Sequence, residues 1–282
     1  DTEASMVAFS SLLADHFMEY RGGGASRDRL GDALYTSTAY PPPLSIIGHS
    51  ECCYNTQWPL SIFFSCVTPA PYGGNTPLYD LVDIARRIPQ ELREKLERMG
   101  VEYEMRYNTP HAWGTAYHCS TRQEAEEGAT TLGKEWRWDG DAFVTTQKQP
   151  AFRRHPQTGR QVWFNLLQMF HSSVMDRMIK EAAREAANEV AHGGEAGDSG
   201  RNDVLGGSDV RFGDGTPISA EDVEMVNKLF EDCCGEFEWQ AGDLLVLDNM
   251  LVGHGRRSFT PPRRLLLRMA GPVRGTEGGG AV

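Results

Sequence analysis

The chain has 282 residues, 40% of them hydrophobic and 24% charged, with a formal net charge of -11 and a pI near 5.2. This length and balance are typical of a globular protein of one large or two small domains with a real core. The net charge argues against a nucleic-acid or anionic-membrane partner, since both are bound by clustered Lys and Arg, and it favours a small-molecule substrate. No apolar run approaches the roughly 20 residues of a membrane helix, and no signal pattern opens the sequence. A homo-oligomer remains compatible with this composition.

Apolar residues at partial helical spacing predict an N-terminal helix that ends before the glycines at 22–24. These residues are Val7, Leu12, Leu13 and Phe17.

Prolines then separate the next predicted elements. Three successive prolines at 41–43 deny the backbone regular ladder bonds and indicate a loop that leads into a strand bearing His49. Residues 60–67 are rich in strand formers and are bounded by prolines, so they predict a buried strand. The composition of 73–77 is that of a turn.

Two packing helices are expected next, the first at 80–87 and the second opening with Pro89 and stopped by Gly100. From 103 to 164 short β-like pieces alternate with turns. Two of these pieces lie at 135–138 and 161–164.

The C-terminal part is predicted to alternate helices, a loop and strands. A capping box at Ser173 starts a helix, and Ser219 caps another. Between them residues 192–209 are rich in glycine and poor in apolar residues, which predicts a mobile loop, either a lid or a plain surface insertion. Apolar strands at 243–248 and 264–269 flank His254.

These elements together predict a mainly β protein with flanking helices, in one domain spanning 1–282. A double-stranded β-helix, or jelly roll, is favoured because it brings an early His-x-Glu strand beside a late His strand. In an extended strand the side chains of His49 and Glu51 point to the same face. With His254 they form a two-histidine, one-carboxylate set, which is the facial triad of non-haem Fe(II) sites.

Six cysteines occur, none in a Cys-x-x-Cys or zinc-finger spacing: Cys52, Cys53, Cys66, Cys119, Cys233 and Cys234. We therefore expect free thiols in a reducing compartment, which predicts a cytoplasmic location for the protein. An alternative is a zinc site in which Cys52 and Cys53 join His49, although thiolates favour a closed tetrahedral site.

Eight segments resemble, in order, the taurine-dioxygenase family of Fe(II)/2-oxoglutarate-dependent oxygenases, and its clavaminate-synthase-like branch in particular. They are HSE (49–51), FF (63–64), GGNTP (73–77), WFN (163–165), FGDG (212–215), WQAGD (239–243), DNMLVGHGR (248–256) and PRR (262–264). The resemblance runs from about residue 8 to 271. It departs from the family in lacking the usual N-terminal segment and in the long insertion after Val190.

The resemblance implies roles for single residues. His49, Glu51 and His254 would hold Fe(II), while Thr76 and Arg264 would bind the distal carboxylate of 2-oxoglutarate. A guanidinium fork and a hydroxyl suit that carboxylate chemically.

Three further residues are substrate-binding candidates. Arg268 lies four residues after Arg264, so a regular strand points both the same way, and the resemblance implies that it binds a substrate anion. The alternative is a structural arginine held in a salt bridge. Asn165 and Trp163 are candidates for the pocket wall, although aromatic residues on strands more often belong to the core.

The implied reaction uses Fe(II), 2-oxoglutarate and O2 to oxidise an unactivated C–H bond, with release of succinate and CO2. Family halogenases carry a small residue at the position of Glu51, so hydroxylation, desaturation or ring closure is favoured here. Two alternatives stay open, a non-catalytic jelly-roll binding protein and a zinc-dependent cupin-like hydrolase.

Overall fold

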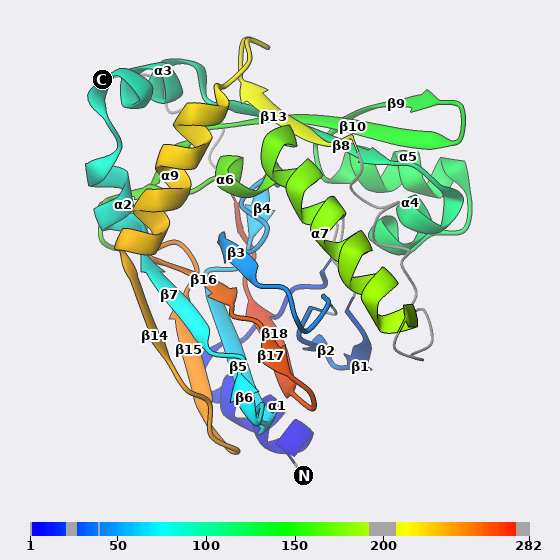
Figure 1. Ribbon diagram of the computed structural model, residues 1–282, viewed down its shortest axis with the longest axis vertical. Helices are drawn as coiled ribbons and strands as arrows, with labels where there is room; N and C mark the ends of the chain where they lie inside the picture. The colour runs from blue at the N-terminus through cyan, green and yellow to red at the C-terminus, as the bar shows by residue number, and fades with distance from the viewer. Residues whose placement is uncertain (1, 21–26, 39, 192–206, 275–282) are drawn as a thin grey trace.

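The computed structural model describes residues 2–20, 27–38, 40–191 and 207–274. Two antiparallel sheets pack around a common core and form a jelly roll, and helices and a third sheet surround them (Figure 1). The mainly β fold class with flanking helices, predicted from the sequence, is confirmed. No described helix is long and apolar enough to cross a membrane.

The larger sheet of the jelly roll is antiparallel throughout. Its strands, in spatial order, are β1 (Arg29–Gly31), β2 (Leu34–Thr36), β18 (Arg264–Ala270), β5 (Ser61–Thr68) and β15 (Leu244–Asp248). The smaller sheet is antiparallel as well. Its order is β14 (Cys234–Phe237), β7 (Thr76–Asp80), β16 (Val252–Arg256) and β3 (Ile46–His49).

A third antiparallel sheet lies at one end of the jelly roll (Figure 1). Its strands are β13 (Asp209–Phe212), β8 (Val101–Tyr107), β10 (Ala142–Gln149) and β9 (Glu135–Asp139). Three two-stranded ribbons complete the described strands: β11 (Phe152–Arg154) with β12 (Gln161–Trp163), β6 (Tyr72–Gly73) with β17 (Phe259–Thr260), and β4 (Gln57–Trp58) with β19 (Val273–Arg274).

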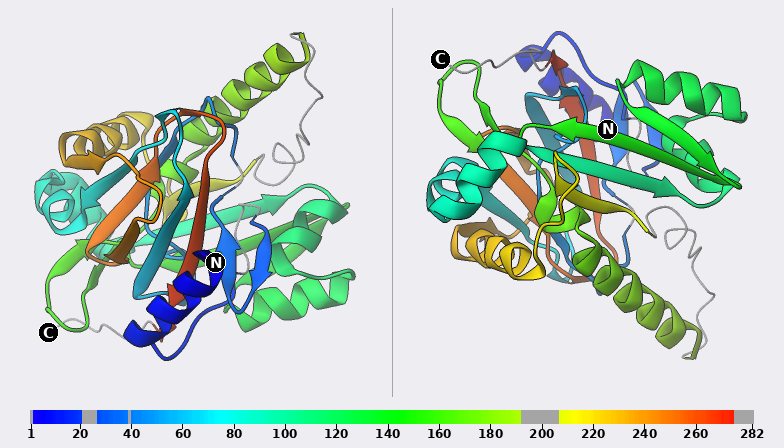
Figure 2. Two further views of the ribbon diagram at one scale, coloured as in Figure 1. Left: turned by 90° about the horizontal axis from the view of Figure 1, so that it is seen from below. Right: turned by 90° about the horizontal axis from the view of Figure 1, so that it is seen from above.

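The described helices pack on the outside of these sheets (Figure 2). They are α1 (Thr2–Leu13), α2 (Leu81–Arg87), α3 (Gln90–Met99), α4 (Pro110–Tyr117), α5 (Arg122–Thr131), α6 (Leu167–Phe170), α7 (Ser172–Ala191) and α9 (Ala220–Asp232). Helix α9 covers the smaller sheet, where Phe230 contacts Tyr79 of β7 at a ring-centroid distance of 5.2 Å. Helix α1 lies against the larger sheet and contacts β5 and β18.

Capping residues that were visible in the sequence start several of these helices. The side chain of Asp80 accepts hydrogen bonds from the first turn of α2, and the side chain of Ser219 does the same for α9. Pro89 precedes α3, and Gly100 ends it with a φ of 66°. The predictions of these helices are confirmed.

Three details differ from the sequence-based expectations. Helices α4 and α5 occupy part of 103–164, where only β-like pieces and turns were expected. In α1, Leu12 is 82% exposed, whereas Met6 and Ser10 are the buried residues. Most of the predicted loop at 192–209 lies outside the described residues, and its last residue, Asp209, begins β13.

Candidate metal centre

Two histidines meet across neighbouring strands of the smaller sheet. His49 ends β3 and lies directly opposite His254 of β16, with 4.5 Å between the ring centroids. Glycines flank both residues, and a Cβ on Gly48 would come within 2.5 Å of the Tyr79 ring. A Cβ on Gly255 would come within 2.7 Å of the Ile46 carbonyl oxygen. The glycines therefore allow the close strand approach that pairs the two imidazoles.

The carboxylate of Glu51 reaches the same point from a turn, not from the strand. β3 ends at His49, so the expected extended His-x-Glu geometry was wrong for Glu51. The turn is fixed by Asn249, which is fully buried. Its Oδ1 accepts from the Glu51 backbone N–H at 2.8 Å, and its Nδ2 donates to the Glu51 carbonyl at 2.9 Å.

The three side chains can hold one metal ion. Their candidate ligand atoms lie within 4.8 Å of one another, and Glu51 Oε1 is 3.7 Å from the Nε2 atoms of both histidines. His49 Nδ1 lies 2.8 Å from the Ile47 carbonyl oxygen, so Nδ1 carries the proton and Nε2 keeps its lone pair for a metal. Such a donor set suits iron, because two imidazoles and one carboxylate leave further positions open.

Burial keeps this centre ready to bind a cation. It lowers the pKa of His254 to about 4, and the neighbouring His49 acts in the same direction, so His254 is neutral near pH 7. Burial alone would raise the pKa of Glu51, but the Arg27 guanidinium and the two neighbouring imidazoles hold that pKa well below its usual range. Both ligands are therefore deprotonated without competition from protons at neutral pH.

The lowered pKa of His254 predicts an acid-sensitive fold. The folded chain binds fewer protons than the unfolded chain between the unfolded pKa of 6.5 and the folded pKa of about 4, so stability falls as the pH is lowered through this window. The loss amounts to at most about 3 kcal/mol. Glu51 acts in the same direction at still lower pH. Thermal melting of metal-free protein should show this slope, and His254→Asn should flatten it; an equal slope in the variant would contradict the assignment.

Asn249→Ala is expected to weaken both the fold and the metal centre. It removes the two bonds to the Glu51 backbone and a third to the Pro59 carbonyl, at a cost of about 3 kcal/mol. Loosening a ligand in this way typically lowers metal affinity about 10- to 100-fold. Asn165→Ala is the matched control, because Asn165 is equally buried and bonds Ala151 and Leu167 instead. Calorimetric Fe(II) titration should separate the two; equal affinities would refute the positioning role of Asn249.

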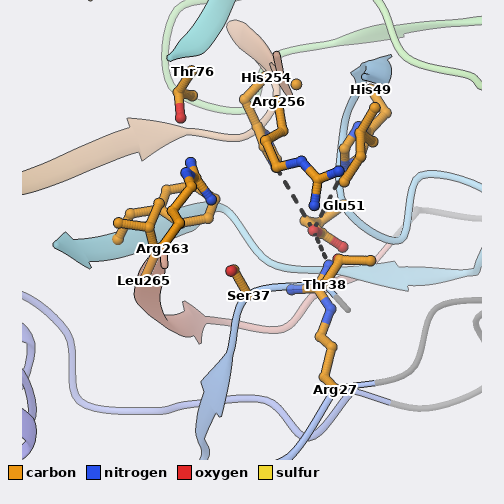
Figure 3. Close-up of a pocket in the computed structure, with 13 residues that line it drawn as sticks. Arg27, Ser37, Thr38, His49, Glu51, Thr76, His254, Arg256, Arg263 and Leu265 are labelled. Carbon is orange, nitrogen blue, oxygen red and sulfur yellow. Dashed lines mark hydrogen bonds and ion pairs between the residues drawn. The ribbon is translucent and has the colours of Figure 1, made fainter. Parts of the chain in front are cut away.

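A cavity between the two sheets opens onto the metal centre (Figure 3). Thr76, at the start of β7, lines it and is buried. Its hydroxyl oxygen accepts from Trp239 Nε1 at 2.8 Å, which leaves its own O–H for donation. Arg263 lines the same side of the cavity, and its Nε donates to the Gly74 carbonyl at 3.0 Å. Burial lowers the pKa of Arg263 to about 10, so it stays charged.

Arg264 does not line this cavity. Its side chain is 45% exposed and pairs with Glu3 of α1 at 2.5 Å. The reason lies in strand alternation, because Leu265 faces the main core and the cavity while Leu266 packs towards α1. Arg264 shares the face of Leu266, and its neighbour Arg263 reaches the cavity instead.

Arg268 follows the same alternation and lies under α1, away from the metal centre. Its side chain is 3% exposed, its Nη1 donates to Ser10 Oγ at 2.8 Å, and its Nη2 donates to the Asp32 carbonyl at 2.8 Å. The guanidinium also lies 3.6 Å from the ring centroid of Phe17. Sequence reasoning was right that Arg264 and Arg268 share a face, but this face is turned towards α1.

Asn165 and Trp163 lie in the core and do not line the cavity in the described structure. Both side chains form hydrogen bonds with nearby residues. Asn165 donates to the Ala151 carbonyl and accepts from the Leu167 N–H, and Trp163 Nε1 donates to Gln168 Oε1 at 3.4 Å. The structure thus brings together His49, Glu51, His254 and Thr76 from the predicted set. It leaves Arg264, Arg268, Asn165 and Trp163 outside the cavity.

Among the residues that sequence reasoning had not singled out, Arg27 and Arg263 line the cavity and Asn249 holds the backbone of Glu51. Arg263 and Asn249 stand inside segments that carried the resemblance, beside residues that were chosen. Arg27 had no such signal, because it follows a glycine run and belongs to no motif.

Two histidines and a carboxylate at the mouth of a jelly roll define a mononuclear non-haem iron centre as the class of site. The sequence model of the taurine catabolism dioxygenase TauD, TfdA family matches residues 2–270, and the chain belongs to this family. It is an Fe(II)- and 2-oxoglutarate-dependent dioxygenase with O2 as co-substrate. The residues at the metal centre fit Fe(II), which supplies the oxidising chemistry when bound with 2-oxoglutarate.

Two curated relatives share most of the chain. One is the dapdiamide synthesis protein DdaC of Enterobacter agglomerans, 27% identical over 93% of this chain and 77% of the relative. The other is a clavaminate synthase-like protein of Arabidopsis thaliana, 29% identical over 88% of this chain and 72% of the relative. The solved structure of a taurine dioxygenase from Burkholderia xenovorans aligns with a TM-score of 0.50 at 16% identity, over 97% of this chain and 74% of that one. This likeness supports the fold alone.

Proposed function

We propose that this dioxygenase hydroxylates an unactivated C–H bond of a small substrate that carries a carboxylate or resembles an amino acid, and releases succinate and CO2. The observation that carries the proposal is the convergence of His49, Glu51 and His254 beside a cavity lined by Thr76 and Arg263. The retained carboxylate of Glu51 favours hydroxylation, or the related desaturation or ring closure, over halogenation.

Each of these residues has a defined task in the proposal. His49, Glu51 and His254 hold Fe(II) through Nε2, a carboxylate oxygen and Nε2. Arg263 and the Thr76 hydroxyl hold the distal carboxylate of 2-oxoglutarate, since both line one side of the cavity and one of them carries a fixed positive charge. Arg263 takes the role that sequence analysis gave to Arg264, because Arg264 points to α1.

The cavity wall supports the same reaction by excluding water from the reacting atoms. Phe64 of β5 and Leu265 of β18 line the cavity from the larger sheet, and the Phe64 ring contacts the His254 ring at a centroid distance of 5.1 Å. The six cysteines are free, which supports a reducing, intracellular compartment for the protein.

Substrate-stimulated turnover of 2-oxoglutarate tests this proposal. We expect at least one member of a panel of amino acids and small carboxylic acids to raise succinate release in the presence of Fe(II) and O2. The corresponding primary amides serve as matched controls and should be weaker. Succinate release that never exceeds the protein-free rate, with any compound and with the metal supplied, would contradict the proposed activity.

A further inference from the structure

Arg27 brings a buried positive charge to the metal centre from outside the two central sheets. Its side chain is 5% exposed, and its Nη2 lies 2.5 Å from Glu51 Oε1. The guanidinium stacks 4.7 Å from the ring centroid of Tyr20, which holds it in place. Figure 3 shows Arg27 approaching Glu51 from the side opposite Thr76, with Arg263 across the cavity.

The guanidinium of Arg27 has hydrogen-bonding capacity that the protein does not use. Its Nε is buried and has no hydrogen-bond partner in the part of the chain that the structure describes. Glu51 Oε1, its ion-pair partner, is also the atom that lies 3.7 Å from both imidazole Nε2 atoms. A carboxylate can bind a metal while it still accepts a hydrogen bond, and an arginine carries five N–H donors in a rigid fork, more than Glu51 uses.

The other two arginines that line the cavity, Arg256 and Arg263, donate hydrogen bonds to backbone carbonyls of the protein. Arg256 donates to the carbonyl oxygens of Tyr40, Pro41 and Leu44, at 2.7 to 2.9 Å. Arg263 donates to the Gly74 carbonyl beside Thr76. Arg27 is therefore the cavity arginine that faces the metal centre itself.

The charges around the cavity favour a further anion. Among the residues that the structure describes, its lining holds Arg27, Arg256 and Arg263 and one carboxylate, Glu51. Fe(II) adds two positive charges and 2-oxoglutarate contributes two negative ones, so the loaded cavity keeps a positive excess. A buried, uncompensated charge is costly, whereas a carboxylate facing a guanidinium forms strong charge-assisted hydrogen bonds.

We propose that Arg27 binds a carboxylate of the substrate beside the metal centre and so determines the selection of an anionic substrate. This inference rests on the proposed function and deepens it. The substrate carboxylate would accept from N–H donors of Arg27 that Glu51 does not use, including the Nε without a partner among the described residues. It would thereby lie on the side of Glu51 opposite Thr76 (Figure 3).

The simpler alternative is that Arg27 only neutralises Glu51. The two accounts differ in what the arginine does after the metal has bound. A counter-ion supports formation of the iron centre, whereas a substrate ligand affects anion binding to a centre that is already formed. The experiment must therefore read the iron centre and anion binding separately.

Anaerobic protein is loaded with Fe(II) and 2-oxoglutarate, and the visible charge-transfer band of the chelate is recorded. The probes are the straight-chain carboxylates from acetate to hexanoate, each paired with its primary amide. We expect carboxylates, and not amides, to perturb the band. Arg27→Gln should weaken this response by roughly 30-fold or more while the band itself still forms, and Arg27→Lys should be intermediate. Arg29→Gln is the matched control, because Arg29 is exposed and pairs with Glu19.

Melting temperatures establish that each variant is folded, and Arg27→Lys keeps the buried charge if Arg27→Gln does not fold. The inference would be overturned if Arg27→Gln or Arg27→Lys bound carboxylates with the same affinity as the unaltered protein. Loss of the band itself in the folded variants would also overturn it, because it would make Arg27 part of the metal or 2-oxoglutarate site. An unaltered protein that forms the band but responds to no carboxylate also contradicts it. Absence of the band from the unaltered protein would instead refute the proposed function.

Discussion

Glu51→Ala is expected to weaken iron binding in the presence of 2-oxoglutarate and to lower turnover, each by more than about 100-fold, because loss of residues that only support a metal ligand already costs about 10- to 100-fold. Its carboxylate oxygen lies 3.7 Å from both imidazole Nε2 atoms, so its removal leaves two neutral ligands for a divalent cation. Fe(II) titration and succinate release measure the two effects.

The same change leaves Arg27 buried without its partner, which costs about 3 to 5 kcal/mol of stability. The double variant Glu51→Ala/Arg27→Met removes this unpaired charge and should bind iron as weakly as Glu51→Ala. Glu236→Ala is the control, because Glu236 also pairs with an arginine, Arg257, but does not line the cavity. Iron binding by the double variant with unchanged affinity would exclude Glu51 as a ligand.

Arg263→Gln is expected to weaken 2-oxoglutarate binding by at least roughly 30-fold, the effect of removing one partner of a buried charge pair. Arg264→Gln should leave the affinity within about twofold, because Arg264 is 45% exposed and pairs with Glu3. The measurement is anaerobic titration of the iron-loaded protein with 2-oxoglutarate.

This pair of variants separates two neighbouring residues that the sequence alone cannot distinguish. Both residues are arginines. Both variants should remain folded in thermal melts, because Arg263 is only partly buried and Arg264 is exposed. The reverse result, with Arg264→Gln losing affinity and Arg263→Gln keeping it, would restore the role implied by the resemblance and reject the assignment from the cavity.

Much of the fold was readable from local signals. Helix ends are marked by side-chain caps at Asp80 and Ser219. The fixed φ of Pro89 marks the start of α3, and the positive φ of Gly100 marks its end. Helices α4 and α5 were missed although Thr109-Pro110 and the Thr121 capping box start them, because the surrounding strands suggested a β-rich segment.

The limits at the candidate site are of a different kind. The pairing of His49 with His254 followed from motif and topology. The choice between Arg263 and Arg264 depended on which face of β18 is turned to the cavity, and Arg264 shares the face of Leu266, which is turned to α1. Asn249 and Arg27 act through long-range contacts, 198 and 24 residues from Glu51, and such contacts exist only once the chain is folded.

The most direct measurement is the visible spectrum of the anaerobic protein during addition of Fe(II) and 2-oxoglutarate. A charge-transfer band that requires both additions, saturates at one iron per chain and is lost in His254→Ala is the result expected from three ligands converging on one open metal position. A protein that stays colourless with both present, or a His254→Ala variant that develops the same band, would contradict it.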